Sequence, residues 1–290
     1  MHHATVGEAA NSFRPNAAEM ISQLFQPTPD PDINALLREL LSRTQAILGT
    51  HFLGSYLTGS LALGDFQTHC SDVDLVIVTH ASVSDDLFAA LREMHGRLAN
   101  DCPPWGAKLE AVYLPLPALR EGAPAGANYP VLEKGGVLEM APLEDAWSVQ
   151  CYTLREHGVA LAGPEPGVLL AAVDPNRMRR ESSVVAGTWL REALTDPTWL
   201  EWLRQRENQA FVVVTLCRLL YTLEVGTVAS KPGAARWARQ TLEPRWSVLI
   251  ERAVGERPDS EEIHESEEAA TLAFVRYTVD RFRQWETAAP

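Results

Sequence analysis

The chain has 290 residues, and 46% of them are hydrophobic, which is enough apolar material to bury the cores of two domains of ordinary size. Its formal net charge of -13 repels phosphate backbones and so argues against a nucleic-acid partner, whereas a cationic small molecule would be attracted.

The cysteines and the apolar runs indicate the compartment. The four cysteines lie far apart and form no CxxC pair, a pattern typical of reduced thiols in a cytoplasm rather than of disulfides or a zinc site. No run approaches the roughly 20 apolar residues that a membrane helix needs, and the N-terminal sequence lacks a signal-peptide pattern. We therefore expect a cytoplasmic protein without a membrane partner. Separately, we expect a monomer.

The first part of the chain alternates between helical and strand patterns. Residues 1–30 are polar and rich in small residues, and we expect them to form a loose segment. Apolar residues at helical spacing then predict a helix over 33–48. Further along we expect strands within 51–57, 74–79 and 108–116, and a helix over 84–100 that Ser84 caps.

A segment dense in proline and glycine, residues 115–144, predicts a boundary between two domains. Helical spacing dominates after it and predicts helices near 145–157, 177–194, 198–225, 232–242, 244–254 and 264–286. We interpret the acidic stretch at 260–268 as the solvated start of the last helix. The expected fold is α+β, with a mixed sheet flanked by helices over 31–140 and an all-α helical bundle over 141–290.

Two aspartates lie one residue apart at the start of the second strand, in the sequence SDVDLVIV. Residues two apart on a strand point to the same side, so Asp72 and Asp74 present their carboxylates together. Taken alone, such a pair more often caps a turn. Two like charges this close resist ionisation unless a cation lies between them, and Mg²⁺ binds carboxylate and phosphate oxygens together. We therefore interpret the pair as ligands of Mg²⁺.

Three further residues are expected beside this pair. Glu110, in the middle of the third strand, would reach the same space and accept a proton from a hydroxyl nucleophile, although alone it would be read as a solvent-facing residue. Gly59 and Ser60 form a turn whose backbone N–H groups and hydroxyl would face phosphate oxygens. In the loop after this turn, Asp65 and His69 are interpreted as solvated residues that close over a nucleotide.

The string YLTGSLALGDFQTHCSDVDLVIV resembles the signature of the polymerase-beta-type nucleotidyltransferase superfamily. With the segments LEAVYLP, HGVALAGPEP and VVVTLCRLLYTLEVGTVASKPGAARWA included, the chain more closely resembles the aminoglycoside adenylyltransferases that modify streptomycin and spectinomycin. The resemblance extends over most of residues 33–285. It implies an N-terminal nucleotidyltransferase domain joined to a helical C-terminal domain.

The resemblance also implies roles for individual residues. In that family two aspartates bind Mg²⁺, a strand glutamate is the catalytic base, and an arginine and a lysine of the helical domain hold the ATP phosphates. By motif position these residues are Asp72, Asp74, Glu110, Arg218 and Lys231.

The local sequence around the two cations is consistent with these roles and leaves simpler ones open. Arg218 lies in a helix that is apolar on nearly every side, so it needs an anion, which a neighbouring acidic residue or a triphosphate would supply. Lys231 precedes Pro232 at an expected helix start, where backbone N–H groups favour an anion. It could equally be an ordinary surface lysine.

The implied reaction is Mg²⁺-dependent transfer of AMP from ATP to a hydroxyl of a small, cationic acceptor, with release of pyrophosphate. Streptomycin-accepting relatives use a tryptophan ahead of the helical domain and acidic residues before the arginine; the corresponding positions here hold Val137 or a neighbour, Arg204 and Asn208. Spectinomycin, streptomycin and another amino sugar or metabolite therefore all stay open as acceptors. So do a catalytically silent nucleotide-binding regulator and an adenylyltransferase that modifies a protein.

Overall fold

The structure is a computed structural model, and it describes residues 26–68, 71–122, 126–133, 136–143, 146–255 and 264–288. Most of the segment expected to be loose, residues 1–25, lies outside this range, and so do His69 and Cys70. In the described part of the chain, no helix is long and apolar enough to cross a membrane.

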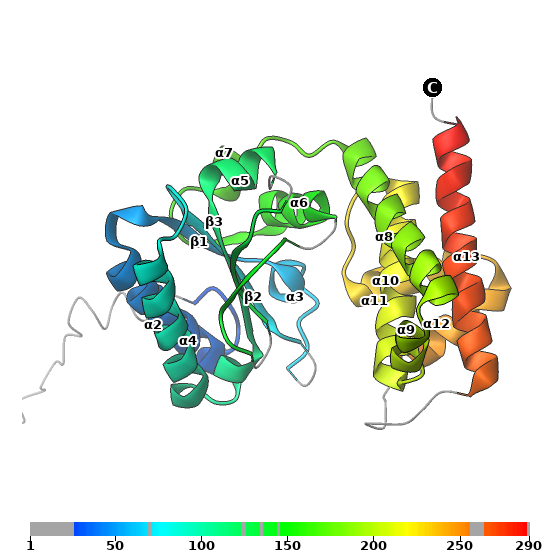
Figure 1. The fold of residues 1–290 in the computed structure, drawn as a ribbon, viewed down its shortest axis with the longest axis horizontal. Coiled ribbons are helices and arrows are strands. Elements are labelled where there is room, and N and C mark those ends of the chain that lie inside the picture. Colours follow the sequence, from blue (N-terminus) through cyan, green and yellow to red (C-terminus); the bar gives the residue numbers. More distant parts are fainter. Residues whose placement is uncertain are drawn as a thin grey trace, which may run out of the picture.

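A six-stranded sheet forms the centre of the N-terminal half (Figure 1). Its strand order is β5-β4-β3-β2-β1-β6. The strands are β1 (Phe52–Leu57), β2 (Val73–Thr79), β3 (Leu109–Pro115), β4 (Tyr129–Leu132), β5 (Glu139–Ala141) and β6 (Val159–Ala162). β2 and β3 run parallel, and the other neighbouring pairs of this sheet run antiparallel. The expected mixed sheet is therefore confirmed.

Helices cover both faces of the sheet. One face packs against α2 (Pro31–Leu48) and α4 (Asp85–Asp101), and the other against α5 (Leu116–Glu121), α6 (Trp147–His157) and α7 (Pro166–Leu169). The α2 and α4 helices begin at side-chain caps: Asp30 Oδ1 accepts from the N–H of Asp32 at 2.9 Å, and Ser84 Oγ accepts from the N–H of Leu87 at 3.4 Å. The cap expected at Ser84 is confirmed.

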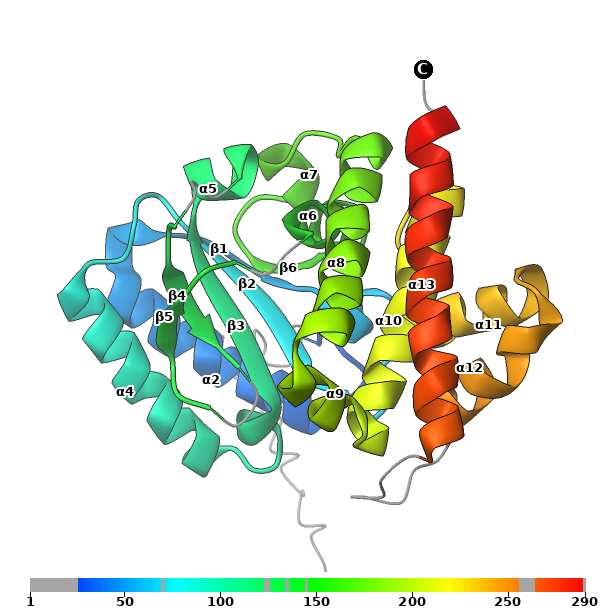
Figure 2. The same ribbon diagram turned by 45° about the vertical axis from the view of Figure 1, so that its right-hand side comes forward.

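The C-terminal half is a bundle of helices around α10 (Figure 2). Its helices are α8 (Pro175–Thr195), α9 (Pro197–Leu203), α10 (Arg206–Val225), α11 (Lys231–Thr241), α12 (Ser247–Val254) and α13 (Glu265–Ala288). The remaining short turns of helix are α3 (Gly59–Ala62), η1 (Gly49–His51), η2 (Trp105–Lys108) and η3 (Pro244–Trp246). α10 contacts α8, α11, α12 and α13, and it is buried on most sides, as its apolar sequence predicts.

The sheet continues past the boundary expected at residue 140. Two strands, β4 and β5, form inside the proline- and glycine-rich segment, and β6 pairs with β1. Strands of three or four residues are too short for alternation to reveal them, and the prolines and glycines between them resemble a linker. Apolar residues as late as Val173 pack in the core of the sheet, whereas Val185 packs in the helical core. We therefore propose a boundary near the start of α8.

The single helix expected over 198–225 is two helices. Gln205 has an extended backbone (φ -70°, ψ 128°) and begins α10. The side-chain amide of Asn208 donates to the carbonyl of Trp202 at 2.9 Å, which satisfies an acceptor at the end of α9. Apolar residues continue at helical spacing on both sides of the break, so their periodicity does not reveal it.

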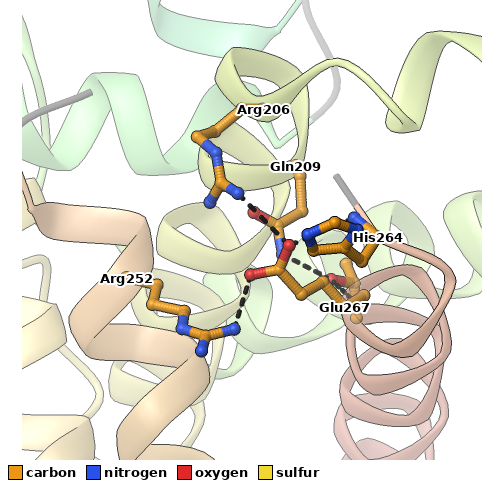
Figure 3. Close-up of polar contacts among 6 residues, drawn as sticks. Arg206, Gln209, Arg252, His264 and Glu267 are labelled. Carbon is orange, nitrogen blue, oxygen red and sulfur yellow. Dashed lines mark hydrogen bonds and ion pairs between the residues drawn. The ribbon is translucent and has the colours of Figure 1, made fainter. Parts of the chain in front are cut away.

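A buried ionic cluster fixes the start of α13 (Figure 3). Glu267 is 6% exposed, and its Oε1 accepts from Arg252 at 2.6 Å. Its Oε2 accepts from Arg206 at 3.2 Å and from the backbone N–H of His264 at 3.2 Å. The expectation of a solvated helix start is therefore wrong for Glu267, because the third residue of the helix points toward α10 and α12.

Candidate active site

Three carboxylates lie on one face of the sheet, where β2 and β3 begin. On β2, Val73 and Leu75 pack into the core under α2 and α4, so Asp74 between them faces the opposite side. Asp74 is paired with Glu110 in the parallel register of the two strands. Asp72 lies two residues before Asp74, and its negative charge acts on Asp74. The structure thus brings together the three acidic residues that the sequence assigns to one site.

Asp74 is largely buried, and a second negative charge lies beside it. Burial, followed by the charge of Asp72, raises the pKa of Asp74 to about 6. The positive charge of Lys231, a hydrogen bond with Glu110 and a hydrogen bond from the backbone N–H of Ser60 act in the opposite direction. A buried carboxylate with a second negative charge beside it is stabilised in its ionised form by a bound cation.

Gly59 allows the turn before α3 to approach Asp74. Its φ is +59°, a region that L side chains rarely adopt. A Cβ atom at this position would lie 1.9 Å from Oδ2 of Asp74. The backbone therefore passes directly against the carboxylate, and only glycine fits there.

Ser60 takes part in the site differently from the expectation. Its backbone N–H donates to Asp74 and so does not face open space, as a phosphate-binding turn would require. Its hydroxyl oxygen is buried without a hydrogen-bond partner among the described residues, and the same is true of Thr58 Oγ1. Because buried polar atoms are normally hydrogen-bonded, these two hydroxyls lack the partner that such atoms usually have.

Lys231 reaches the site from the helical half. It is the first residue of α11, which Ser230 caps by accepting from the N–H of Gly233 at 3.2 Å. The lysine is exposed, and its charge stabilises the ionised form of Asp74. Residues from the two halves of the chain therefore face each other across one site.

Arg218 lies on α10, next to the segment that carries this lysine. Its Nε donates to the carbonyl of Ala229 at 3.2 Å, two residues before Lys231. The structure thus places both expected phosphate-binding cations at the same end of the helical half.

The donor set is consistent with a magnesium site that a substrate completes. In the described ranges, no group of three or more His, Cys, Asp and Glu side chains forms a metal site by itself. Mg²⁺ usually takes one or two carboxylates and fills its octahedron with waters and substrate phosphates. Asp72 and Asp74 supply two carboxylates, and the buried hydroxyl of Ser60 lies at the turn that touches Asp74.

The positions expected to distinguish acceptors have partners within the helical half or are exposed. Nε of Arg204 pairs with Oε2 of Glu268 on α13 at 2.8 Å. Asn208 bonds to the end of α9, as described above. Val137 is 54% exposed, in the connection between β4 and β5.

One contact across the site was missed by the sequence analysis. The hydroxyl of Ser230 donates to the carboxylate of Asp65, which was expected to be solvated. The two residues are 165 positions apart, and no local pattern relates them. His69, the other residue expected to close over the nucleotide, lies outside the described residues.

Comparisons with known proteins identify relatives over most of the chain. The family described as aminoglycoside adenylyltransferase, C-terminal domain, matches residues 183–281. An aminoglycoside (3'') (9) adenylyltransferase from Shigella flexneri is 24% identical over 232 residues, which cover 76% of this chain and 83% of the relative. A spectinomycin 9-adenylyltransferase from Staphylococcus aureus is 24% identical over 250 residues, covering 82% of this chain and 91% of the relative.

A solved structure has the same fold. It is the spectinomycin adenyltransferase AAD(9) from Enterococcus faecialis, crystallised with ATP and spectinomycin. The TM-score is 0.64 at 15% sequence identity, and the match covers 86% of this chain and 98% of that one. The α+β fold with a helical C-terminal part, expected from the sequence, is therefore confirmed.

Proposed function

Because this chain is a member of the aminoglycoside adenylyltransferase family, we propose that it transfers AMP from ATP to a hydroxyl of an aminoglycoside or aminocyclitol antibiotic, with release of pyrophosphate. One observation supports this more than any other. The positive charge of Lys231, from the helical half, stabilises the ionised carboxylate of Asp74 on the sheet. A nucleotide triphosphate with a divalent cation is a ligand whose charges match both sides of such a site.

In the proposed reaction Asp72 and Asp74 would hold Mg²⁺. When bound, this ion would neutralise charge on the phosphates and lower the cost of ionising the attacking hydroxyl. The carboxylates meet the requirement for an oxygen-rich site, and their mutual repulsion is relieved by the ion.

Glu110 is the proposed catalytic base. It takes the proton of the acceptor hydroxyl while that oxygen forms a bond to the α-phosphorus of ATP. The bond from the α-phosphorus to the oxygen that bridges to the β-phosphate breaks, and pyrophosphate leaves with that electron pair. Since Glu110 pairs with Asp74 in the strand register, the base is beside the carboxylates that orient the phosphates.

The helical half supplies the positive charge on the leaving side. Lys231 and Arg218 stabilise the negative charge that builds on pyrophosphate, and the hydroxyl of Ser60 donates to a phosphate oxygen. Most of the rate enhancement would thus come from placement and charge, for which a site between two halves of a chain is well suited.

The proposed acceptor is a cationic small molecule of the spectinomycin or streptomycin type. The net charge of -13 favours its approach. Arg204, which is paired with Glu268, stands where streptomycin-accepting relatives have an acidic residue, and Asn208 offers no charge. We therefore rank spectinomycin first, since a smaller acceptor with fewer cationic groups needs fewer acidic contacts.

The test is an assay of pyrophosphate release with ATP and Mg²⁺ across a panel of aminocyclitols, with mass spectrometry of the products. We expect an acceptor that gains one AMP group. The Glu110→Gln variant should bind ATP as the wild type does in calorimetry and lose turnover by roughly a hundredfold or more.

Two results would contradict the proposal. Glu110→Gln with near-normal turnover would exclude Glu110 as the base. ATP binding without AMP transfer to any compound of the panel would favour a nucleotide-binding regulator, or an enzyme with a protein acceptor.

A further inference from the structure

We propose that Asp65 is a positioning residue, which holds Lys231 toward the carboxylate site by connecting the N-terminal half to the cap of α11. This inference rests on the proposed function and extends it to a residue outside the carboxylate cluster. Its basis is a chain of contacts that runs from the sheet to the lysine.

The first contact ties Asp65 to the turn beside the carboxylates. The backbone N–H of Asp65 donates to the carbonyl of Ser60 at 3.1 Å. Ser60 in turn donates its own N–H to Asp74. The position of the Asp65 carboxylate is therefore linked, through one residue, to the aspartate that is proposed to bind the metal.

The second contact crosses to the helical half. The carboxylate of Asp65 accepts a hydrogen bond from the hydroxyl of Ser230, which is 9% exposed. The same hydroxyl oxygen caps α11 by accepting from the N–H of Gly233. Since Lys231 follows Ser230 directly, a shift of the serine also shifts the origin of the lysine side chain.

The segment 229–231 is thus held from both halves of the chain. Arg218 binds the carbonyl of Ala229 from within the helical half, and Asp65 binds Ser230 from the sheet half. Without Asp65, the segment would lose the hydrogen bond that ties Ser230 to the sheet half. The stabilisation of a charge that develops in the transition state depends on the position of the cation to within a fraction of an ångström. A displaced Lys231 should therefore lower kcat more than it weakens substrate binding.

The test is a kinetic double-mutant cycle with Asp65→Ala and Lys231→Ala. In the wild-type background, we expect Asp65→Ala to lower kcat for AMP transfer roughly tenfold, with a smaller change in the KM for ATP. In the Lys231→Ala background, the same substitution should change kcat less than about twofold. Asp65→Asn, whose side-chain oxygen still accepts a hydrogen bond, should restore most of the loss. Asp86→Ala, an exposed aspartate in the first turn of α4, is the matched control and should leave kcat unchanged.

If Asp65→Ala lowered kcat by the same factor in the wild-type and Lys231→Ala backgrounds, Asp65 would not act through Lys231. That result would overturn the inference. A lowered melting temperature with full kcat in Asp65→Ala would also overturn it, since the residue would then be merely structural.

A second cycle needs neither ATP nor an acceptor, and so separates this inference from the proposed function. Asp65→Ala and Ser230→Ala should be non-additive in the free energy of unfolding of the nucleotide-free protein. If the two losses in the free energy of unfolding were additive, Asp65 and Ser230 would not be coupled. The inference would then be overturned whether or not the protein transfers AMP. Non-additivity in a protein that transfers no AMP would support the connection and count against the proposed function alone.

Discussion

At the scale of single residues, Gly59 has the strictest requirement in the site. The Cβ of an alanine at this position would overlap Oδ2 of Asp74, and the positive φ would add backbone strain. In Gly59→Ala the carboxylate must move, and we expect turnover to fall by about a hundredfold or more because Asp74 can no longer face Asp72 correctly. Steady-state kinetics of AMP transfer would measure the effect.

Gly49→Ala is the matched control for this variant. Gly49 also has a positive φ, of +52°, but a Cβ there would meet nothing within 4 Å. We expect Gly49→Ala to lose about 1 kcal/mol of stability and to keep its turnover. If both variants lost stability to the same extent and both retained turnover, the contact between Gly59 and Asp74 would have no catalytic importance.

The residues of the site differ in how far sequence could identify them. Asp74 and Glu110 lie in strands whose alternation fixes the face on which each carboxylate lies, and Asp72 directly precedes β2, so their convergence could be predicted. Arg218 and Lys231 were assigned by resemblance, because no local rule brings a distant helix to a strand. Asp65 was expected to be a solvated loop residue, and its contact with Ser230 could not be predicted, since that contact depends on how two halves of the chain meet.

At the scale of secondary structure, long periodic elements were predicted well and short ones were not. α2, α4, β2 and β3 have enough residues for their buried face to show in the sequence, and the first two also have capping residues. β4, β5 and β6 have three or four residues each and owe their pairing to neighbouring strands. Local patterns do not contain that information.

The buried carboxylate of Glu267 at the start of α13 should stabilise the fold. Glu267 is buried between Arg206 and Arg252 and accepts the backbone N–H of His264, so it connects three helices. In Glu267→Gln the negative charge between Arg206 and Arg252 is removed from a buried position, and we expect the free energy of unfolding to fall by about 3 kcal/mol. Urea denaturation at pH 7 would measure this loss.

The free energy of unfolding should depend on pH through the carboxylate of Glu267. Burial disfavours its charged form, but the hydrogen bond from His264 and the two arginines outweigh burial and lower the pKa of Glu267. Its contribution to stability is therefore present above the ordinary pKa of a glutamate and is lost as the pH falls through the lowered value. Glu265→Gln, exposed in the first turn of the same helix, should change neither stability nor its pH profile by more than about 0.5 kcal/mol. If the two variants had equal effects, the buried cluster would not stabilise the helix.

At the scale of the whole molecule, the sheet and the helical bundle have separate cores. The apolar residues around α10 form one cluster, and those on the two faces of the sheet form others, without a shared member. The candidate site lies where the halves meet, with carboxylates from one and Lys231 from the other. A ligand that binds both sides should therefore make the unfolding of the two halves more cooperative.

This arrangement predicts the effect of ATP and Mg²⁺ on thermal unfolding. A ligand at one hundred times its Kd that binds only the folded protein adds about 2.7 kcal/mol, which should raise Tm by roughly 4–5 °C in a chain of 290 residues. Differential scanning calorimetry should show a sharper single transition with ATP and Mg²⁺ than without them.

Two variants test which residues carry this shift in Tm. Glu110→Gln, which removes the base and leaves the phosphate contacts, should keep the full shift. Lys231→Ala should give a smaller shift than the wild type, because the contact between the nucleotide and the helical half is weakened. A full shift in Lys231→Ala, or a stabilised sheet half that unfolds apart from an unaffected helical half, would mean that the nucleotide contacts one half of the chain alone.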